Sequence, residues 1–350
     1  MNELILVTGG TGFIGSHTAV ELMQAGFRVA IIDNLSNSRV EVIDGIEKIT
    51  GKRPLFEKID LLEENLLDDF FPRHPDIKAV IHFAAYKSVP ESVRKPLMYY
   101  ENNLFSLIHL FKLMVKYGVE YFVFSSSCTV YGDPDILPVT EMSPIKKANS
   151  PYGSTKQISE EIISGSVNAS LPLKAISLRY FNPIGAHPSG LIGELPIGIP
   201  GNLVPFITQT AYGLHEELKV FGIDYNTPDG SCIRDYIDVV DLSKAHVSSI
   251  ERLLQKKNKS NYEIFNLGTG KGVSVLEMIR AFERSTGVKI NYRITGRREG
   301  DIPMVWADTT LANIELGWKV DAPLENTLRS AWKWEQYYRN TFQKEEKKVK

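Results

Sequence analysis

Tyr152 and Lys156 are spaced so that both can serve one reaction. They stand four residues apart in a stretch that predicts a helix beginning at Ser150-Pro151, so both side chains project from one face. A buried ammonium beside a phenol stabilises the phenolate and lowers the phenol pKa from about 10 toward neutrality. Such a group can remove a proton from an alcohol while a hydride leaves the same carbon. Because ordinary helix surfaces show the same spacing, the interpretation needs support from elsewhere in the chain.

Three consecutive serines precede this pair and could supply a further hydroxyl. Ser125, Ser126 and Ser127 directly follow the apolar run at residues 121–124, which predicts a buried strand. Ligands of open α/β sheets bind at the carboxyl ends of the strands, where a hydroxyl can hydrogen-bond a reacting oxygen. Serines at a strand end also form simple turns, and at least one of the three is expected to do only that.

Three glycines, Gly9, Gly12 and Gly15, indicate a phosphate-binding turn. They lie between the apolar run at residues 4–7 and a helical pattern that ends at Gly26. This spacing allows a tight turn and a close approach of the main chain to a pyrophosphate, which then faces the positive end of the helix. No Gly-Lys-Ser/Thr follows, so a P-loop is excluded. A plain strand–helix turn is the alternative.

Asp33 strengthens the dinucleotide interpretation. It ends the second apolar run, at residues 29–32, about 20 residues after the glycines, where a carboxylate can accept hydrogen bonds from the adenosine ribose. The same charge would repel a ribose 2′-phosphate, which favours NAD over NADP. Taken alone, Asp33 is also explained by a strand-end Asx turn with Asn34.

Further apolar runs predict the sheet that positions these groups. They occupy residues 79–83, 121–124 and 175–178, with helical stretches between them. Runs without polar alternation are typical of parallel strands covered on both faces. Two helices are well marked, one from Pro96 to Gly118 and one beginning at Ser150-Pro151. The fold class is therefore α/β, with a Rossmann-type doubly wound parallel sheet.

The character of the chain changes after Asn182. Residues 183–201 are rich in Gly and Pro and lack periodicity, which indicates a binding loop or a domain junction. We expect residues 1–182 to form the NAD-binding domain, joined by a return of about 235–268 that includes the strand-like run 263–267. Residues 183–340 are expected to form a smaller C-terminal α/β domain that binds substrate, and residues 341–350 a disordered tail.

Composition excludes several functional classes. Among 350 residues, 40 are basic and 42 acidic, a balance that argues against nucleic-acid binding. No apolar run reaches about 18 residues, so no membrane span is expected, and the N-terminus lacks the basic region of a secretory signal. With Cys128 and Cys232 as the only cysteines, and no metal-ligand spacing among the seven His, we expect a cytoplasmic protein without a metal site.

Several motifs together resemble one enzyme family. They are Thr8-Gly9-Gly10-Thr11-Gly12-Phe13-Ile14-Gly15-Ser16-His17, Asp33-Asn34-Leu35, Ser125-Ser126-Ser127-Cys128-Thr129-Val130-Tyr131-Gly132, Ser150-Pro151-Tyr152-Gly153 with Lys156, Arg179-Tyr180-Phe181-Asn182, Gly185-Ala186-His187-Pro188-Ser189-Gly190 and Arg234-Asp235-Tyr236. The chain is similar to the extended short-chain dehydrogenases/reductases, and within them to the UDP-glucose 4-epimerase (UDP-galactose 4-epimerase) group. The similarity runs from residue 3 to about residue 335.

The resemblance implies NAD-dependent epimerisation of UDP-sugars at C4 through a transient 4-keto intermediate. Tyr152 would take the 4′-OH proton while C4 gives hydride to NAD, with Ser127 as a second catalytic residue and Lys156 tuning the tyrosine. The keto sugar then turns over in the pocket and hydride returns to its other face, so NAD is regenerated and stays bound. The cofactor residues implied are Gly9, Gly12, Phe13, Ile14, Gly15, Asp33, Asn34, Asp60, Leu61, Phe83, Ala84, Lys87, Asn102, Tyr152, Lys156 and Tyr180.

The resemblance also implies a site for the sugar nucleotide. Two arginines in it would face the diphosphate, because guanidinium groups offer fixed paired donors. Without the resemblance, surface ion pairs of Arg234 with Asp235 and of Arg298 with Glu299 are the preferred interpretation. The substrate residues implied are Ser127, Tyr152, Asn182, Asn202, Leu203, Phe221, Arg234, Arg298, Asp301 and Val305.

Departures from the family pattern concern specificity. Cys128 replaces the usual Ala, and Ala85-Tyr86 replaces Gly-Leu before Lys87, but neither change removes a reacting group. Many bacterial members carry Tyr where this chain has Val305, and members with a smaller residue there tend to accept N-acetylated sugars. We therefore hypothesise activity on UDP-GlcNAc and UDP-GalNAc as well as on UDP-glucose and UDP-galactose. The alternative is that Val305 only repacks.

Two other functions stay open, and one assembly is implied. A sugar-nucleotide 4,6-dehydratase would carry an Asp-Glu pair after the hydroxyl position, where this chain has Cys128-Thr129. A non-catalytic NAD-sensing protein of the same fold usually lacks the Tyr/Lys pair. The apolar stripe at 96–118 is either core or subunit interface, and the resemblance implies that it forms a homodimer's four-helix bundle with the Tyr152 helix.

Overall fold

A seven-stranded parallel sheet forms the centre of the molecule. The computed structural model describes residues 2–169, 171–298 and 300–346. The strand order is β10-β6-β5-β4-β1-β2-β3, and every neighbouring pair is parallel. This order confirms the Rossmann-type, doubly wound fold class. The strands are β1 (Leu4–Thr8), β2 (Arg28–Asp33), β3 (Leu55–Lys58), β4 (Ile77–His82), β5 (Tyr121–Ser127), β6 (Lys174–Tyr180) and β10 (Tyr262–Leu267).

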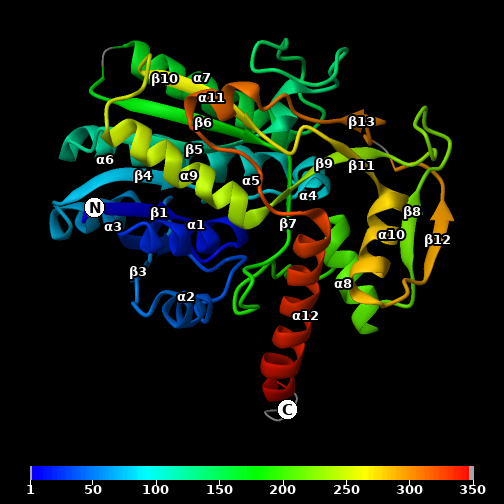
Figure 1. Ribbon diagram of the computed structural model, residues 1–350. Helices are drawn as coiled ribbons and strands as arrows, with labels where there is room; N and C mark the ends of the chain where they lie inside the picture. Colours follow the sequence, from blue (N-terminus) through cyan, green and yellow to red (C-terminus); the bar gives the residue numbers. More distant parts are fainter. Residues whose placement is uncertain (1, 170, 299, 347–350) are drawn as a thin grey trace.

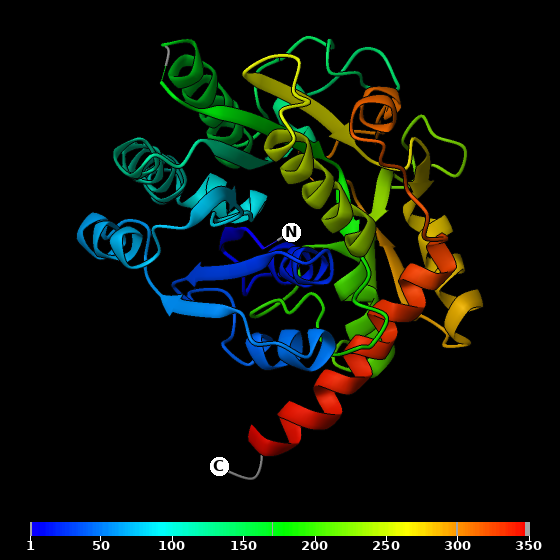
Figure 2. The same ribbon diagram turned by 60° about the vertical axis from the view of Figure 1, so that its left-hand side comes forward.

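Helices cover both faces of this sheet, which explains the continuous apolar runs. One face packs against α1 (Phe13–Gln24), α2 (Val42–Thr50) and α9 (Val239–Leu254). The other packs against α3 (Glu64–Arg73), α6 (Ser106–Tyr117) and α7 (Pro151–Asn168). The rotated view separates α3, α6 and α7 from the helices of the opposite layer (Figures 1 and 2). Burial on both sides favours strands without polar alternation.

The helix expected from Pro96 to Gly118 is interrupted. After α4 (Val89–Arg94), the chain forms α5 (Pro96–Tyr100), a π-helical turn, η1 (Glu101–Phe105), and then α6. In this wide turn the Asn103 amide accepts a hydrogen bond from Tyr86 N at 2.9 Å and donates one to Tyr86 O at 3.0 Å. A π turn widens the helix locally and is common at functional sites. It places Asn102 and Asn103 beside the segment that follows β4.

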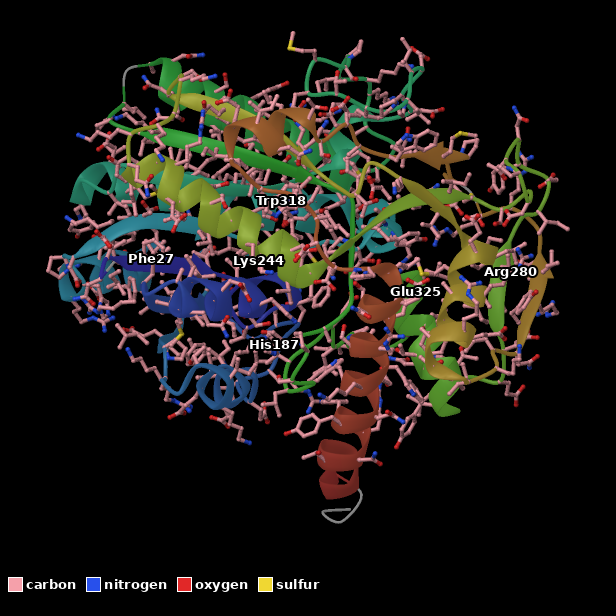
Figure 3. All side chains as sticks on the ribbon, viewed as in Figure 1. Phe27, His187, Lys244, Arg280, Trp318 and Glu325 are labelled. Atoms are coloured by element: carbon pink, nitrogen blue, oxygen red, sulfur yellow. The ribbon has the colours of Figure 1, made fainter. Side chains whose placement is uncertain are left out.

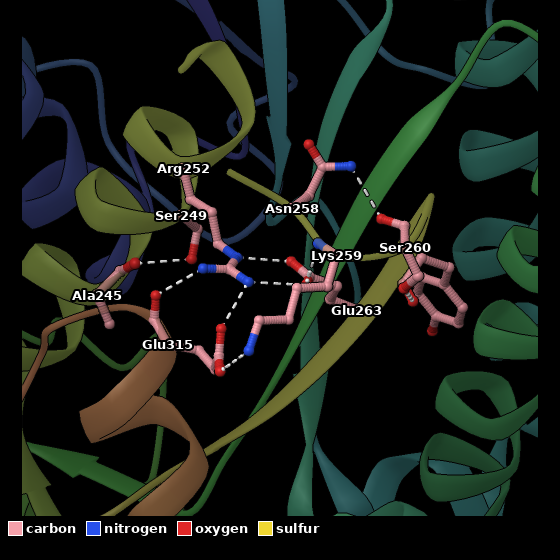
Figure 4. A network of polar contacts seen from close by, with 9 residues as sticks. Ala245, Ser249, Arg252, Asn258, Lys259, Ser260, Glu263 and Glu315 are labelled. Atoms are coloured by element: carbon pink, nitrogen blue, oxygen red, sulfur yellow. Dashed lines mark hydrogen bonds and ion pairs between the residues drawn. The ribbon is translucent and has the colours of Figure 1, made fainter. Parts of the chain in front are cut away.

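The edge strand β10 is tied into the sheet by buried charges. Arg252 of α9 donates from Nε to Glu263 of β10 at 2.7 Å, and from a terminal nitrogen to Glu315 of α11 (Thr310–Glu315) at 2.9 Å. Lys259 also pairs with Glu315 (Figure 4). Trp318 adds a 2.7 Å hydrogen bond to Asp241 O on α9, which it overlies in Figure 3. Glu315 and Trp318, late in the sequence, thus help to hold α9 against the sheet next to its edge strand.

A smaller C-terminal α/β unit lies beside the carboxyl ends of the large sheet. In it, β9 (Ile233–Asp238) pairs with β7 (Asn182–Ile184), β11 (Gly272–Ser274) and β13 (Met304–Val305), and β8 (Leu218–Phe221) pairs with β12 (Tyr292–Thr295). The helices α8 (Leu203–Tyr212), α10 (Val275–Thr286) and α12 (Leu324–Glu346) build its core.

Part of the expected disordered tail is helical. The backbone of α12 continues to Glu346, so the prediction for residues 341–346 is corrected, and residues 347–350 lie outside the described part of the chain. Gln, Lys and Glu are good helix formers, which allows the last turns to extend the helix. No helix within the described residues has the length and apolarity needed to cross a bilayer.

Candidate functional site

The glycine turn is packed so tightly on neighbouring backbone that Gly9 and Gly15 leave no room for a side chain. Gly9 follows β1 with a φ of +70°, a conformation that favours glycine. A Cβ on Gly9 would lie 2.7 Å from Ala84 N, and one on Gly15 would lie 2.3 Å from Gly9 O. Gly12 caps α1 without a side-chain hydrogen bond to the helix N-terminus. These glycines therefore leave a cradle at the positive end of α1 that suits a pyrophosphate.

Asp33 is fixed at the end of β2 beside this cradle. Its Oδ2 accepts a hydrogen bond from Thr11 N at 3.1 Å, within the glycine turn, and its Oδ1 accepts one from Leu35 N at 2.9 Å. The second bond has the geometry of the Asx turn considered above, so this carboxylate both closes a turn and faces the glycine segment. Asn34 donates to Asp60 at 2.9 Å, which joins two further residues expected near the adenosine.

Other predicted cofactor residues lie in the segment after β4 and in the π-helical turn η1. Phe83 and Ala84 follow β4, and Asn102 lies in η1 with its amide donating to Asn103 at 2.9 Å. The Lys87 ammonium is 3.0 Å from Glu194 of the loop at 183–201. Leu61 differs from these, because its side chain is buried in the core against α3 and α6. The main chain of the glycine turn, the Asp33 carboxylate, the Lys87 ammonium and the Asn102 amide together offer the polar groups that a dinucleotide needs.

Ser127, Tyr152 and Lys156 meet at the carboxyl edge of the sheet. Ser127 ends β5, where its hydroxyl accepts a hydrogen bond from Thr129 N at 3.2 Å and lies close enough to the Tyr152 phenol to lower the pKa of that group in part. The Lys156 ammonium donates to Ser125 O at 2.5 Å and lies 5.9 Å from the Tyr152 ring centre. Helix α7 begins at Pro151 with Ser150 as its N-cap, as expected. The helix and the strand together hold a hydroxyl, a phenol and an ammonium in one place.

Tyr180 and the first serine complete this edge. Tyr180, the last residue of β6, shares a hydrogen bond between its phenol and the Ser125 hydroxyl. Ser126 points to the other face of the sheet and donates to Glu160 at 2.5 Å. Ser126 therefore has a different partner from Ser125, because successive side chains of a strand point to opposite faces.

The pKa values differ from the expectation for the phenol. Burial raises the pKa of Tyr152 above its ordinary value, and the nearby Ser127 hydroxyl lowers it only in part. Burial also lowers the pKa of Lys156 to about 7, against the opposing charge of Glu160. A low-dielectric site penalises the charged form of both groups, so each is driven toward neutrality. The protein by itself does not shift the phenol pKa downward.

Glu160 and Arg179 form a buried ion pair behind the reacting groups. Arg179 of β6 donates twice to the Glu160 carboxylate, at 2.9 and 2.5 Å, and also to the Tyr131 hydroxyl at 3.0 Å. The side chains of the pair are only 4% and 9% exposed. Sequence reasoning missed Glu160, although its position four residues after Lys156 on the same helix face could have revealed it.

The residues predicted to bind the sugar nucleotide form a cluster in the smaller unit. Arg298 donates to Asp301 at 2.6 Å, and its guanidinium lies 5.6 Å from the ring centre of Phe221. Arg234 of β9 has a nitrogen 4.0 Å from the same Asp301 carboxylate. Two cations, one anion and an exposed aromatic ring thus share one surface, which suits a diphosphate and a flat base.

The ion pair proposed between Arg234 and Asp235 is wrong. Asp235 is fully buried and accepts hydrogen bonds from Thr269 N at 2.7 Å, Gly270 N at 3.1 Å and Ala307 N at 3.1 Å. Neighbours on a strand project to opposite faces, so the two charges are directed apart. Glu299, the other partner considered, lies outside the described residues.

Val305 lies beside Arg234, a predicted substrate residue, and in the same cluster as Cys128, which follows the catalytic candidate Ser127. It pairs in register with Arg234 across β13 and β9, and it is 3% exposed in a cluster with Phe181 and Cys128. Burial raises the pKa of the Cys128 thiol to about 12, with Arg234 opposing. Asn182 begins β7, and Asn202 and Leu203 begin α8, so the remaining predicted substrate residues start elements of the smaller unit.

Within the residues that the structure describes, no group of three or more His, Cys, Asp or Glu is arranged to hold a metal ion. Three histidines are instead buried and neutral, because burial lowers the pKa of His17 and His82 to about 3 and that of His246 to about 4. Sequence reasoning also passed over Asn103 and Glu194, whose contacts join segments distant in the chain.

Comparisons with known proteins agree with this geometry. The model of the NAD dependent epimerase/dehydratase family matches residues 5–268. The UDP-glucose 4-epimerase of Dictyostelium discoideum is 48% identical over 335 residues, which cover 96% of each chain.

Two solved structures are similar over almost their whole length. One is the UDP-glucose-4-epimerase from Stenotrophomonas maltophila with bound NAD and formylated UDP-arabinopyranose, with a TM-score of 0.93 and 45% identity, covering 97% of this chain and 99% of that one. The other is the enzyme of that name from Bifidobacterium longum in complex with NAD+ and UDP, with a TM-score of 0.92 and 44% identity, covering 97% and 100%.

Proposed function

Because this chain belongs to the NAD dependent epimerase/dehydratase family, we propose that it is an isomerase that inverts C4 of UDP-sugars, including UDP-glucose and UDP-galactose, with NAD as its cofactor. One observation supports the proposal above all. Ser127 and Tyr152 lie at the same carboxyl edge of the parallel sheet as the glycine cradle that follows β1, and Cys128, next to Ser127, is close enough to Arg234 for the two groups to interact electrostatically. NAD bound at the glycine cradle and a UDP-sugar bound at the arginines would therefore meet at the Tyr152 phenol, which can transfer a proton.

Separate groups of residues bind NAD and the UDP-sugar. Gly9, Gly12 and Gly15 hold the pyrophosphate of NAD and Asp33 its adenosine ribose, while Arg234 and Arg298 hold the UDP diphosphate. When bound, NAD would supply the acceptor for the hydride of C4 and would return that hydride to the keto sugar. The domain of residues 1–182, with the return at 235–268, binds the cofactor, and residues 183–340 bind the UDP-sugar.

Tyr152 moves the proton of the 4′-hydroxyl. Its oxygen removes the proton as the C4 ketone forms and gives the proton back after the sugar has turned over. Ser127 donates to the reacting oxygen and so orients it toward Tyr152. Lys156, held by Ser125 O at 2.5 Å, keeps a positive dipole or charge near the phenol and stabilises the phenolate as it forms.

The site also accepts N-acetylated sugars in this proposal. Val305 is aliphatic and buried against Phe181 in the wall beside Arg234. An isopropyl group at this position leaves more room next to the C2 substituent of the sugar than a phenol would. UDP-GlcNAc and UDP-GalNAc are therefore substrates together with the two unacetylated sugars.

The protein acts as a cytoplasmic homodimer in this proposal. Three apolar side chains on the consecutive elements α4, α5 and η1 are exposed, namely Val93 at 60%, Leu97 at 80% and Phe105 at 50%. Exposed apolar surface of this kind marks an interface, and α4 and α5 both contact α7. Both cysteines are free thiols, which suits a reducing compartment. Sedimentation velocity is expected to give a dimer for the wild type and a monomer for Leu97→Asp.

The activity test uses purified protein without added NAD. Incubation with UDP-galactose, and separately with UDP-glucose, is expected to give the same final mixture of the two C4 epimers from either side. NAD released by denaturing the protein is expected at close to one equivalent per chain. A 4-keto-6-deoxy product would instead indicate the dehydratase, and retained NAD without any turnover would indicate the sensor.

A further inference from the structure

The Glu194 carboxylate joins the two halves of the site. Its Oε1 accepts a hydrogen bond from Lys87 Nζ at 3.0 Å and another from Asn202 Nδ2 at 2.8 Å. Lys87 follows β4 on the cofactor side, whereas Asn202 precedes α8 on the substrate side. A single oxygen atom of the loop at 183–201 thus contacts one predicted ligand residue from each side.

The backbone that carries this carboxylate is itself held firmly. Glu194 O accepts a hydrogen bond from Trp334 Nε1 of α12 at 2.9 Å. Gly193 lies so close to the Trp334 ring that a Cβ there would come within 2.4 Å of it. Ile192, one residue earlier, is fully buried in the core that covers the large sheet. Glu194 therefore projects from a fixed position.

Its two partners, Lys87 and Asn202, are both exposed to solvent. The Lys87 side chain is 56% exposed, compared with 11% for Glu194. A long exposed lysine loses conformational freedom when a ligand orders it, and this loss weakens binding. If the side chain is already ordered by a fixed carboxylate, less freedom is lost when the ligand binds. The ion pair also neutralises Glu194, whose charge would otherwise repel the phosphates of both ligands.

We propose that Glu194 is a positioning residue of this site, which holds Lys87 and Asn202 in the orientations in which they bind NAD and the UDP-sugar. The inference rests on the proposed function, because the roles of Lys87 and Asn202 do. Glu194 moves no proton in the reaction. It links cofactor retention to substrate affinity through one carboxylate.

The test compares two charge-removing substitutions. Glu194→Gln keeps the size and one acceptor oxygen of the side chain but removes its charge. The matched control is Glu283→Gln, because Glu283 on α10 accepts a similar 3.1 Å hydrogen bond from Lys289 and its side chain is 18% exposed. KM and kcat are measured with UDP-galactose, together with the NAD that each protein retains after gel filtration.

Glu194→Gln is expected to raise KM roughly tenfold and to lower NAD retention, with kcat within about twofold of wild type, as for loss of a charged hydrogen bond that acts in binding. Glu283→Gln is expected to leave all three quantities unchanged. Asn202→Ala separates the two sides, because it raises KM while NAD retention stays as in wild type.

A double-substitution cycle shows whether Glu194 acts through Lys87. If it does, NAD retention of Glu194→Gln/Lys87→Met equals that of Lys87→Met alone, rather than the product of the two single effects. Unchanged KM and retention in Glu194→Gln, tighter NAD binding, or a loss confined to kcat would each overturn the inference. If the wild type itself fails to interconvert the two sugars, the proposed function fails, while the retention measurements still test the link between Glu194 and Lys87.

Discussion

Lys156 Nζ donates a 2.5 Å hydrogen bond to the main-chain carbonyl of Ser125, so the ammonium beside Tyr152 is tied to the strand that ends in Ser127. Three groups of the proposed reaction are thereby held together by one contact between α7 and β5. The same burial that fixes the lysine lowers its pKa to about 7. Burial of Lys156 therefore lowers the free energy of unfolding by an amount that depends on pH.

Lys156→Met is expected to stabilise the protein more at low pH than at high pH. The unfolded chain has a lysine pKa of about 10.4, so between about pH 7 and pH 10 the unfolded state binds more protons at this residue than the folded state does. The Lys156 contribution to stability therefore rises with pH across this window, and it is least favourable below about pH 7. Urea unfolding of both proteins at the two ends of the window measures the difference, and a pH-independent difference would contradict the prediction.

Tyr152→Phe is expected to lower kcat by roughly 10²- to 10⁴-fold, because it removes the group that transfers the proton. NAD retention is expected to change little, since the substitution leaves the glycine turn and the Asp33 carboxylate unchanged. Tyr262→Phe is the matched control, because the Tyr262 phenol is bonded to Ser177 at 2.8 Å outside the site. An equal loss of kcat in Tyr152→Phe and Tyr262→Phe would contradict a role of Tyr152 in proton transfer.

Glu160→Gln is expected to lower the free energy of unfolding by about 3 kcal/mol, because it leaves the buried charge of Arg179 without its anion. Urea unfolding at neutral pH measures this change. Arg53 provides the contrast, since its pair with Asp44 is about half exposed and Asp44→Asn should change stability much less than Glu160→Gln does. A loss for Glu160→Gln as small as the loss for Asp44→Asn would refute the prediction.

Gly15→Ala is expected to abolish NAD retention, because its Cβ would lie 2.3 Å from the backbone oxygen of Gly9 and would push the turn apart. Gly165→Ala is the control for the same change of side chain. A Cβ at Gly165 meets nothing within 4 Å, and this exposed position inside α7 should gain about 0.5–1 kcal/mol from the substitution. Bound NAD is measured by absorbance after denaturation.

Val305→Tyr is expected to lose activity on UDP-GlcNAc and UDP-GalNAc while keeping activity on UDP-glucose and UDP-galactose. The larger phenol would take up the space left by the isopropyl group in the wall shared with Phe181 and Cys128. Steady-state rates on all four sugars measure the effect. Wild-type protein that fails to turn over UDP-GlcNAc, or a variant that still does, would show that Val305 only fills the core.

The local features of this site were predictable from the sequence because they depend on neighbouring residues. The Ser150 cap and Pro151 start a helix that presents Tyr152 and Lys156 on one side. Buried parallel strands require continuous apolar runs, which are visible at 4–7, 29–32 and 79–83. Positive φ at Gly9 needs glycine. Each pattern follows from the backbone geometry of a few consecutive residues.

Other properties depended on which segments the fold brings together. Sequence neighbours suggested Arg234 with Asp235, but strand alternation separates those side chains, and Arg234 lies 4.0 Å from Asp301 instead. The spacing of Tyr152 and Lys156 suggested a lowered phenol pKa, whereas burial raises it.

The sequence by itself determined the fold class and pointed to the residues proposed for the chemistry, since periodicity, caps and glycine positions are local properties of the chain. Only the tertiary structure decided the partners of the charged groups and the direction of their pKa shifts. Pairs such as Lys87 with Glu194 are 107 residues apart, and desolvation is set by everything packed around a group. Neither can be read from the spacing of residues along the chain.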